Sequence, residues 1–96
     1  MNKLNSVRPE IYLQWFASVD QGTAFEMCAK IEDVNYPLLS IIAVDTDESL
    51  WLEFESGKHL VQIPITRVME MLEDASKGVH SENWYEKNIY NKLEDN

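Results

Sequence analysis

Apolar and polar residues alternate along much of the first two thirds of the chain. Alternation with a period of two places successive side chains on opposite faces of a β-strand, so each such run predicts a strand with one face turned inward. In "LWLEFE" the inward set is Leu50, Leu52 and Phe54, and the outward set is Trp51, Glu53 and Glu55. In "TAFEMCAKIED" the inward set is Phe25, Met27, Ala29 and Ile31, and the outward set is Glu26, Cys28, Lys30 and Glu32.

The segment 10–20 fits two periods. A strand would place Ile11, Leu13, Trp15, Ala17 and Val19 on one face. A helix would group Ile11, Tyr12, Trp15, Phe16 and Val19, with Pro9 near its first turn and Gly22 as its stop. Because "VDQGT" is a plausible tight turn into the next alternating run, we favour a hairpin, and the helix stays as the alternative.

Two further strands are expected in the middle of the chain. The run "LLSIIAVD" (38–45) is β-branched and nearly continuous, which is typical of a strand covered on both faces. The turn "TDES" leads into the strand at 49–56, and "SGKH" leads into a strand at 59–63.

The period changes to that of a helix after Pro64. Apolar residues recur at helical spacing through "ITRVMEMLEDASKG", which predicts a helix near 65–77 that ends at Gly78. The apolar positions are Ile65, Val68, Met69, Leu72 and Ala75. Ser81 is a suitable cap for a second helix near 81–93, whose buried side would use Trp84, Ile89 and Leu93.

Strands therefore come first and helices last, which predicts an α+β fold. We expect one small acidic domain spanning residues 1–96, with an antiparallel β-meander of about four to five strands. The two C-terminal helices are expected to pack mainly on one face of this sheet.

The charge balance restricts the partners of the protein. Seventeen acidic residues against eight basic ones give a net charge of -9 and a pI near 4.5. Such a surface repels nucleic acids and anionic membranes unless a basic patch exists, and the basic residues are scattered along the chain. The expected partner is therefore a basic protein, with no direct nucleic-acid or membrane contact.

Cysteine use and the N-terminal residues point to a cytoplasmic protein. Cys28 is the only cysteine, so no intramolecular disulfide can form, and we expect a buried thiol. The stretch "MNKLNSVRPE" lacks the apolar core of a signal peptide, and "PLLSIIAV" is too short to span a bilayer.

Catalytic and metal-binding patterns are incomplete. The two histidines, His59 and His80, fall in expected turns and outside any nucleophile motif. His80 and Glu82 match the H-x-E of zinc deaminases, but that site also needs a C-x-x-C pair. A calcium loop starting at Asp45 would need glycine and glutamate where Leu50 and Ser56 stand. We expect no enzymatic activity, no metal and no cofactor.

Acidic residues gather around a tryptophan in "DTDESLWLEFE". The acids are Asp45, Asp47, Glu48, Glu53 and Glu55, with no base among them. Trp51 shares the outward face of its strand with two of these acids. An exposed aromatic anchor beside carboxylates suits a site for a basic protein. The alternative is that Trp51 lies under a helix and the acids form a solvated edge.

The segment "ENWYEKNIY" provides a second candidate surface through Glu82, Tyr85 and Glu86. We expect Trp84 to dock on the sheet and Tyr85 to lie nearer the rim. The alternative is that both aromatic residues belong to the core, since small domains use C-terminal helices as lids.

The phrases "LWLEFESGKHLVQIPI" and "VHSENWYEKNIY" resemble bacterial immunity proteins of contact-dependent growth-inhibition systems. The resemblance covers about the second half of the chain. It implies a protein that binds and neutralises a cognate toxin domain, commonly a nuclease, and it brings no catalytic residues with it. Two other classes stay open, which are an acidic adaptor or regulatory protein, for example phage-encoded, and an enzyme that uses carboxylates alone.

Overall fold

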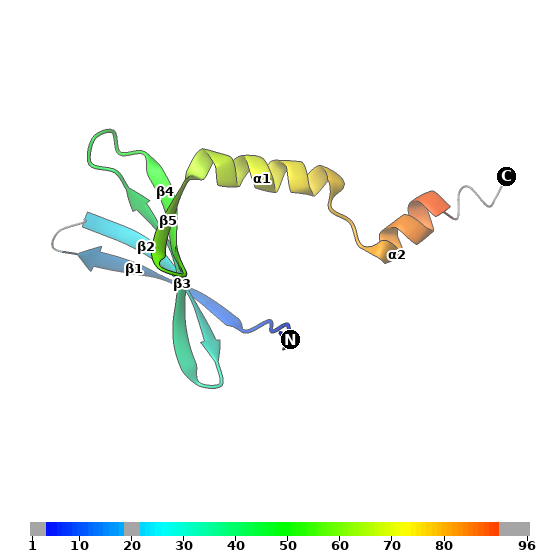
Figure 1. Cartoon of the computed structure of the whole chain (residues 1–96), viewed down its shortest axis with the longest axis horizontal. Coiled ribbons are helices and arrows are strands. Elements are labelled where there is room, and N and C mark those ends of the chain that lie inside the picture. The colour runs from blue at the N-terminus through cyan, green and yellow to red at the C-terminus, as the bar shows by residue number, and fades with distance from the viewer. Residues whose placement is uncertain (1–3, 19–21, 91–96) are drawn as a thin grey trace.

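The computed structural model describes residues 4–18 and 22–90, which form a five-stranded antiparallel sheet followed by a helical arm (Figure 1). The strands are β1 (Glu10–Ser18), β2 (Gly22–Ile31), β3 (Val34–Ala43), β4 (Leu50–Ser56) and β5 (His59–Pro64). The helices are α1 (Ile65–Gly78), α2 (Glu82–Tyr85) and a π-helical turn, η1 (Glu86–Tyr90). The predicted α+β class with a β-meander is confirmed.

Each strand pairs with its neighbours in sequence, in the order β1-β2-β3-β4-β5. Residues 10–18 form a strand, so the hairpin prediction is confirmed and the helical alternative is wrong. The turn predicted at "VDQGT" falls partly on residues 19–21, which lie outside the described residues.

The strand registers give the sheet two different faces, because residues directly opposite in an antiparallel pair share a face. The apolar face consists of Ile11, Leu13, Trp15, Phe25, Met27, Ala29, Tyr36, Leu39, Ile41, Leu50, Leu52, Phe54, Val61 and Ile63. The acidic face includes Gln14, Glu26, Cys28, Ser40, Ile42, Trp51, Glu53, Glu55, Leu60, Gln62 and Pro64. The alternation predicted for the two clearest strands is therefore confirmed.

Strand β3 begins four residues earlier than the predicted start at residue 38. The chain reverses at Glu32 and Asp33, whose φ angles of 51° and 65° fit a two-residue hairpin turn. Pro37 lies inside the strand, whereas the predicted strand began just after it. The register of β2 with β3 shifts between Met27 and Cys28, and a proline is tolerated at such a bulge.

The expectation that β3 is covered on both faces is wrong. Cys28 and Ala29 are the only buried hydrophobic residues in the described part of the chain, with 3% and 1% of their surfaces exposed. The apolar run of β3 lies at the centre of the sheet. A central position gives it neighbouring strands on both edges, but these do not cover its faces. Among the described residues, no second layer covers either face.

The predicted packing of both helices on one face of the sheet is also wrong. Helix α1 starts directly after Pro64, with no connecting residue, and leads away from the sheet (Figure 1). Among the described elements, α1 contacts only β4 and β5, and α2 contacts only η1. A helix that continues from the end of a strand without a loop cannot fold back over the same sheet.

The helix ends agree with the sequence signals. Helix α1 ends at Gly78, and the Ser81 Oγ accepts a hydrogen bond of 3.2 Å from the Trp84 N–H. The predicted second helix consists of α2 and η1 as far as Tyr90, and its last predicted residues lie outside the described ones. None of the helices described here is both long and apolar enough to cross a membrane.

Trp84 does not dock on the sheet, contrary to the prediction. Its ring stacks on His80 with a centroid distance of 3.7 Å, and Tyr85 meets it edge-on at 5.1 Å. The aromatic residues of this segment therefore pack on one another, because the sheet is out of reach of α2.

Candidate protein-binding site on the acidic face

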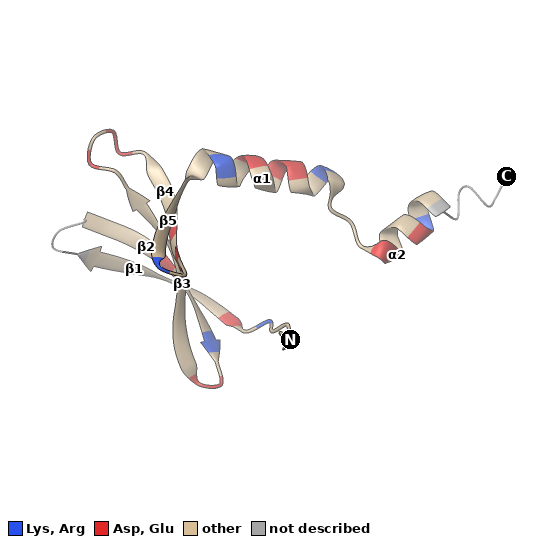
Figure 2. Ribbon diagram, viewed as in Figure 1, with Lys and Arg blue, Asp and Glu red and all other residues tan. Residues whose placement is uncertain are grey.

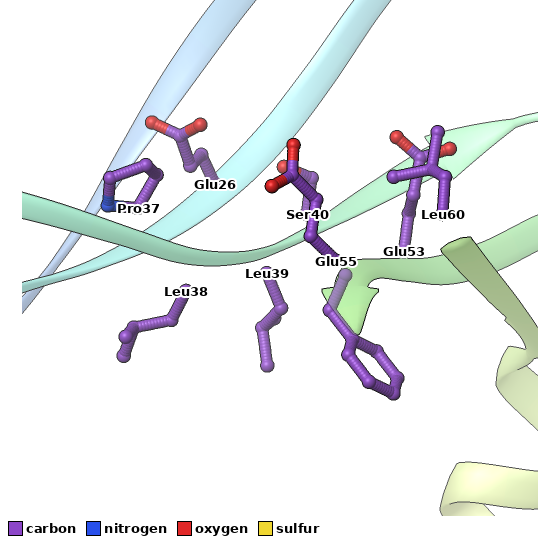
Figure 3. A pocket seen from close by; sticks show the side chains of 9 residues that line it. Glu26, Pro37, Leu38, Leu39, Ser40, Glu53, Glu55 and Leu60 are labelled. Atoms are coloured by element: carbon purple, nitrogen blue, oxygen red, sulfur yellow. The ribbon is translucent and has the colours of Figure 1, made fainter. Parts of the chain in front are cut away.

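The centre of the acidic face is an open hollow of about 430 Å³ whose lining includes three glutamates. Glu26 comes from β2, and Glu53 and Glu55 come from β4. Ser40 of β3 lies opposite both Glu26 and Glu53 in the strand registers, so these three side chains form a row across the sheet. Figure 3 shows the glutamates on one side of the sheet, with Leu38 and Leu39 on the other.

Neutral hydrogen-bond donors hold two of the carboxylates in place. The Gln14 Nε2 donates to the Glu26 Oε1 at 2.8 Å, and the Gln62 Nε2 donates to the Glu53 Oε2 at 2.8 Å. No lysine or arginine is among the described residues that line the hollow. The carboxylates are therefore oriented by their neighbours while their charge remains available to a partner.

Cys28 is a buried residue of this face, and its buried thiol was predicted from the sequence. Its Sγ donates to the Glu26 Oε1 at 3.2 Å. Burial, followed by the hydrogen bond with Glu26, raises the pKa of the Cys28 thiol. Burial also raises the pKa of the neighbouring Tyr12 hydroxyl, with a further contribution from Cys28. The thiol stays protonated and acts as one more neutral donor to Glu26.

A second hollow of about 260 Å³ extends the acidic face towards the β3–β4 turn. Its lining includes Asp45, Glu53, Leu60 and Gln62. Glu53 and Leu60 line both hollows. The fold thus brings the predicted residue Asp45 next to the glutamates of β4.

Trp51 lies on the acidic face, as the alternation predicted, and is half-buried. It stands opposite Ile42 and Pro64 in the strand registers. Its Nε1 donates to the Ser49 Oγ at 3.0 Å, and the Asp47 Oδ1 accepts from the Ser49 N–H at 3.0 Å. The indole is thereby fixed to the turn before β4, with part of its surface still exposed.

The turn before β4 holds the remaining acids of the first candidate set. Glu48 is exposed and has a φ angle of 59°, and its N–H donates to the Val44 carbonyl at 2.8 Å. Hydrogen bonds from the hydroxyl and then the backbone N–H of Ser49 lower the pKa of Asp47 below its usual 3.8. Asp47 thus shapes the turn, whereas Glu48 projects from it.

The Asp47→Ala variant is expected to lose part of the acid sensitivity of folding. A carboxyl whose pKa is lower in the folded state stabilises the fold above its unfolded pKa, and this stabilisation disappears as the pH falls through the folded value. Urea unfolding at pH 7 and at pH 3 measures the effect. The free energy of unfolding should fall less on acidification in Asp47→Ala than in the parent, with Asp74→Ala as an exposed control. Equal acid sensitivity in all three proteins would contradict the prediction.

The second candidate set is separate from the first. Glu82, Tyr85 and Glu86 lie on α2 and η1, which contact no strand of the sheet among the described elements (Figure 1). Tyr85 retains 37% of its surface exposed beside Trp84. The nine predicted residues therefore fall into a group on the sheet and a group on the helical arm.

The sequence interpretation missed Glu26, Gln14 and Gln62 as parts of the site. Glu26 was expected to face outward, but its place beside Glu53 depends on the registers of β2, β3 and β4. The only available signal was that Glu26 and Glu53 both occupy outward positions in their alternating runs. This signal was weak, because the bulge at Met27 and Cys28 changes which residues of β2 and β3 lie opposite each other.

Within residues 4–18 and 22–90, no three His, Cys, Asp or Glu side chains gather as a group that could hold a metal ion. Comparisons of the chain with protein-family models, curated proteins and solved structures found no match. The function is therefore inferred from the geometry and charge of the acidic face.

Proposed function

We propose that this protein binds a basic protein through the acidic face of its sheet, and that it acts as an immunity protein that neutralises a cognate toxin domain. The observation that carries the proposal is the row of Glu26, Ser40 and Glu53 across the central hollow, in which neutral donors orient both carboxylates and no base is among the described lining residues. The toxin is proposed to be a nuclease, in keeping with the resemblance to contact-dependent growth-inhibition immunity proteins.

The physical basis is charge complementarity. A nuclease active site is basic because it must hold phosphates, so an acidic protein can occupy or cover it in place of the nucleic acid. Complementary potentials also speed association, which matters when a toxin must be captured before it acts.

The acidic face combines charge with an aromatic anchor. Glu53 and Glu55 provide partners for arginine or lysine at the contact, and Trp51 precedes them on the same side of β4. Tryptophan and arginine are frequent among the residues that dominate interface energies. An adaptor with another basic partner would use the same surface, so the two functions differ in the partner and in whether an activity is inhibited.

Under this proposal, we expect the neighbouring gene to encode the basic toxin domain. The test uses the purified product of that gene, titrated with the parent protein and with the Glu53→Lys and Glu55→Lys double variant. Association is expected to slow by about 10-fold at low salt and to lose much of its salt dependence, because rim charges act mainly on association. Stopped-flow fluorescence at several salt concentrations measures both quantities.

The matched control is the Glu73→Lys and Asp74→Lys double variant on helix α1. It changes the net charge by the same amount, at a place remote from the acidic face. Equal slowing in both variants would indicate that association depends on the net charge of the protein and not on the acidic face. Unchanged rates in the Glu53→Lys and Glu55→Lys variant would overturn the assignment of the site.

Tight binding without inhibition of the partner's activity would favour the adaptor. A loss confined to Glu82→Lys and Glu86→Lys would move the site to the helical arm.

A further inference from the structure

The single chain is far more extended than a folded chain of its length. Its radius of gyration is 19.0 Å, whereas a compact domain of 96 residues has about 12.5 Å. It exposes 8809 Å², about 3,100 Å² more than the roughly 5,700 Å² expected for a compact protein of 11.2 kDa. The apolar part of this surplus is surface that a stable chain normally covers.

Much of the exposed surface is the apolar face of the sheet. Leu13 and Trp15 keep 54% and 75% of their surfaces exposed, although Trp15 packs on Phe25 with a centroid distance of 4.4 Å. The strand registers place no carboxylate on this face among the described residues of the five strands. A surface of this kind on a soluble chain marks an interface.

Helix α1 exposes a second apolar surface. The helix stripe, which faces one side of α1, consists of Ile65, Val68, Met69, Leu72 and Ala75. Met69 and Leu72 each keep 62% of their surfaces exposed. Helical spacing places the charged residues on the other side of the helix, where Arg67 pairs with Glu70 at 3.0 Å and Lys77 pairs with Glu73 at 3.6 Å. Figure 2 shows where acidic and basic positions occur along the ribbon of α1.

The two apolar surfaces fit each other in size but cannot meet within one chain. The 14 residues of α1 give a helix of about 21 Å, comparable with the roughly 19 Å width of five paired strands. Because α1 follows Pro64 directly, it leads away from its own sheet. Short connections of this kind favour the exchange of an element between two copies.

We propose that two copies of this chain form a symmetric dimer in which the helix stripe of each copy packs on the apolar face of the other. The surplus of about 3,100 Å² per chain, of which the apolar face and the helix stripe are part, is large enough to supply the roughly 800 Å² that a standard interface takes from each partner. Two acidic chains can meet here because this contact is free of carboxylates. A basic partner would find no charge to pair with on this face.

The dimer is independent of the proposed function, because it uses the opposite face of the sheet from the acidic hollow. The wild-type protein alone provides the first test. Light scattering coupled to size exclusion should give about twice 11.2 kDa, and the thermal midpoint should rise with protein concentration, because folding and association are coupled. A mass of 11.2 kDa with a concentration-independent midpoint would overturn the proposal.

The matched variants are Met69→Glu and Met71→Glu. Both methionines are similarly exposed, at 62% and 65%. Met69 lies within the helix stripe beside Leu72, whereas Met71 lies at its edge, next to Val68 and Ala75. Met69→Glu should raise the dimer dissociation constant about 30-fold or more, because it buries a charge against an apolar face, whereas a charge at the edge in Met71→Glu can stay in solvent and should have a clearly smaller effect. Equal effects would overturn the role of the stripe.

Mixing variants tests the exchange itself. Leu13→Glu damages the apolar face and Met69→Glu damages the stripe, so each homodimer carries two damaged contacts. A mixed dimer has one intact contact and should form preferentially when the two variants are refolded together, as native mass spectrometry would show. Sheets that pack face to face without the helices would give no such rescue, and Met69→Glu would then have no effect. That result would overturn the proposal even if the protein is a dimer.

Discussion

The Trp51→Ala variant is expected to bind the basic partner about 30-fold or more weakly, which corresponds to a loss of about 2 kcal/mol or more. The reason is the position of the indole beside Glu53 and Glu55 on the acidic face, where its N–H is already bonded to Ser49. A side chain fixed in this way loses little conformational freedom on binding. Surface plasmon resonance should therefore show faster dissociation with a nearly unchanged association rate.

The three tryptophans of the chain provide matched controls, because each lies on a different surface. Trp15 lies on the apolar face and Trp84 stacks on His80 in the helical arm. Trp15→Ala should weaken the dimer, and Trp84→Ala should affect neither the dimer nor the binding of the partner. A loss of partner binding in Trp84→Ala, with none in Trp51→Ala, would place the site on the helical arm.

Stability decides how a loss of binding in Trp51→Ala is interpreted. Trp51 is half-buried opposite Ile42 and Pro64, so the variant is also expected to lose some stability. Trp51→Phe keeps most of the apolar area and removes the hydrogen bond to Ser49, and it should retain most of the affinity. One result would contradict the role of Trp51 as an anchor. In that result, Trp51→Ala unfolds, and Trp51→Phe is stable but has lost its affinity for the basic partner. Trp51 would then be a packing residue.

The strands were predictable because their signal is local. Each alternating run sorts its own residues between two faces, so Trp51 and Glu53 could be assigned to one side without knowledge of any neighbour. The same is true of the helix after Pro64 and of the Ser81 cap, which depend on a few adjacent residues. The start of β3 was missed because Glu32 and Asp33 adopt positive φ angles without a glycine.

The arrangement of these elements was not predictable in the same way. The helix stripe of α1 was correctly identified, and packing on the sheet of the same chain was assumed to follow. That assumption fails because the chain has no residue between β5 and α1 with which to reverse direction. A periodic pattern shows that a surface must be buried, and the length of the connection decides which copy of the sheet can bury it.

The two faces of the sheet would then serve two purposes. The apolar face would hold a second copy, and the acidic face of each copy would remain open to a basic partner. A symmetric dimer would present two acidic faces on one particle. Its acidic field would also be stronger than that of one chain, which should favour association with a basic protein.

An insertion of Gly-Ser-Gly-Ser between Pro64 and Ile65 is expected to convert the dimer into a monomer. The added residues would let α1 turn back, so that the helix stripe covers the apolar face of its own sheet and the contact becomes intramolecular. Closing the added loop has a small entropic cost. The intramolecular contact avoids the larger loss of translational and rotational entropy that association of two chains requires. The mass should fall to about 11.2 kDa, with far-ultraviolet circular dichroism unchanged and a thermal midpoint independent of concentration.

The same insertion between Val79 and His80 is the matched control, because it lengthens the chain beyond α1 and leaves the junction with β5 intact. This protein should stay a dimer, and both insertion variants should still bind the basic partner, since neither changes the acidic face. A junction variant that remains dimeric with an unchanged dissociation constant would show that the missing loop does not cause the exchange. If both insertions dissociate the dimer equally, the contact must include α2 and η1, and the helix stripe of α1 alone is insufficient.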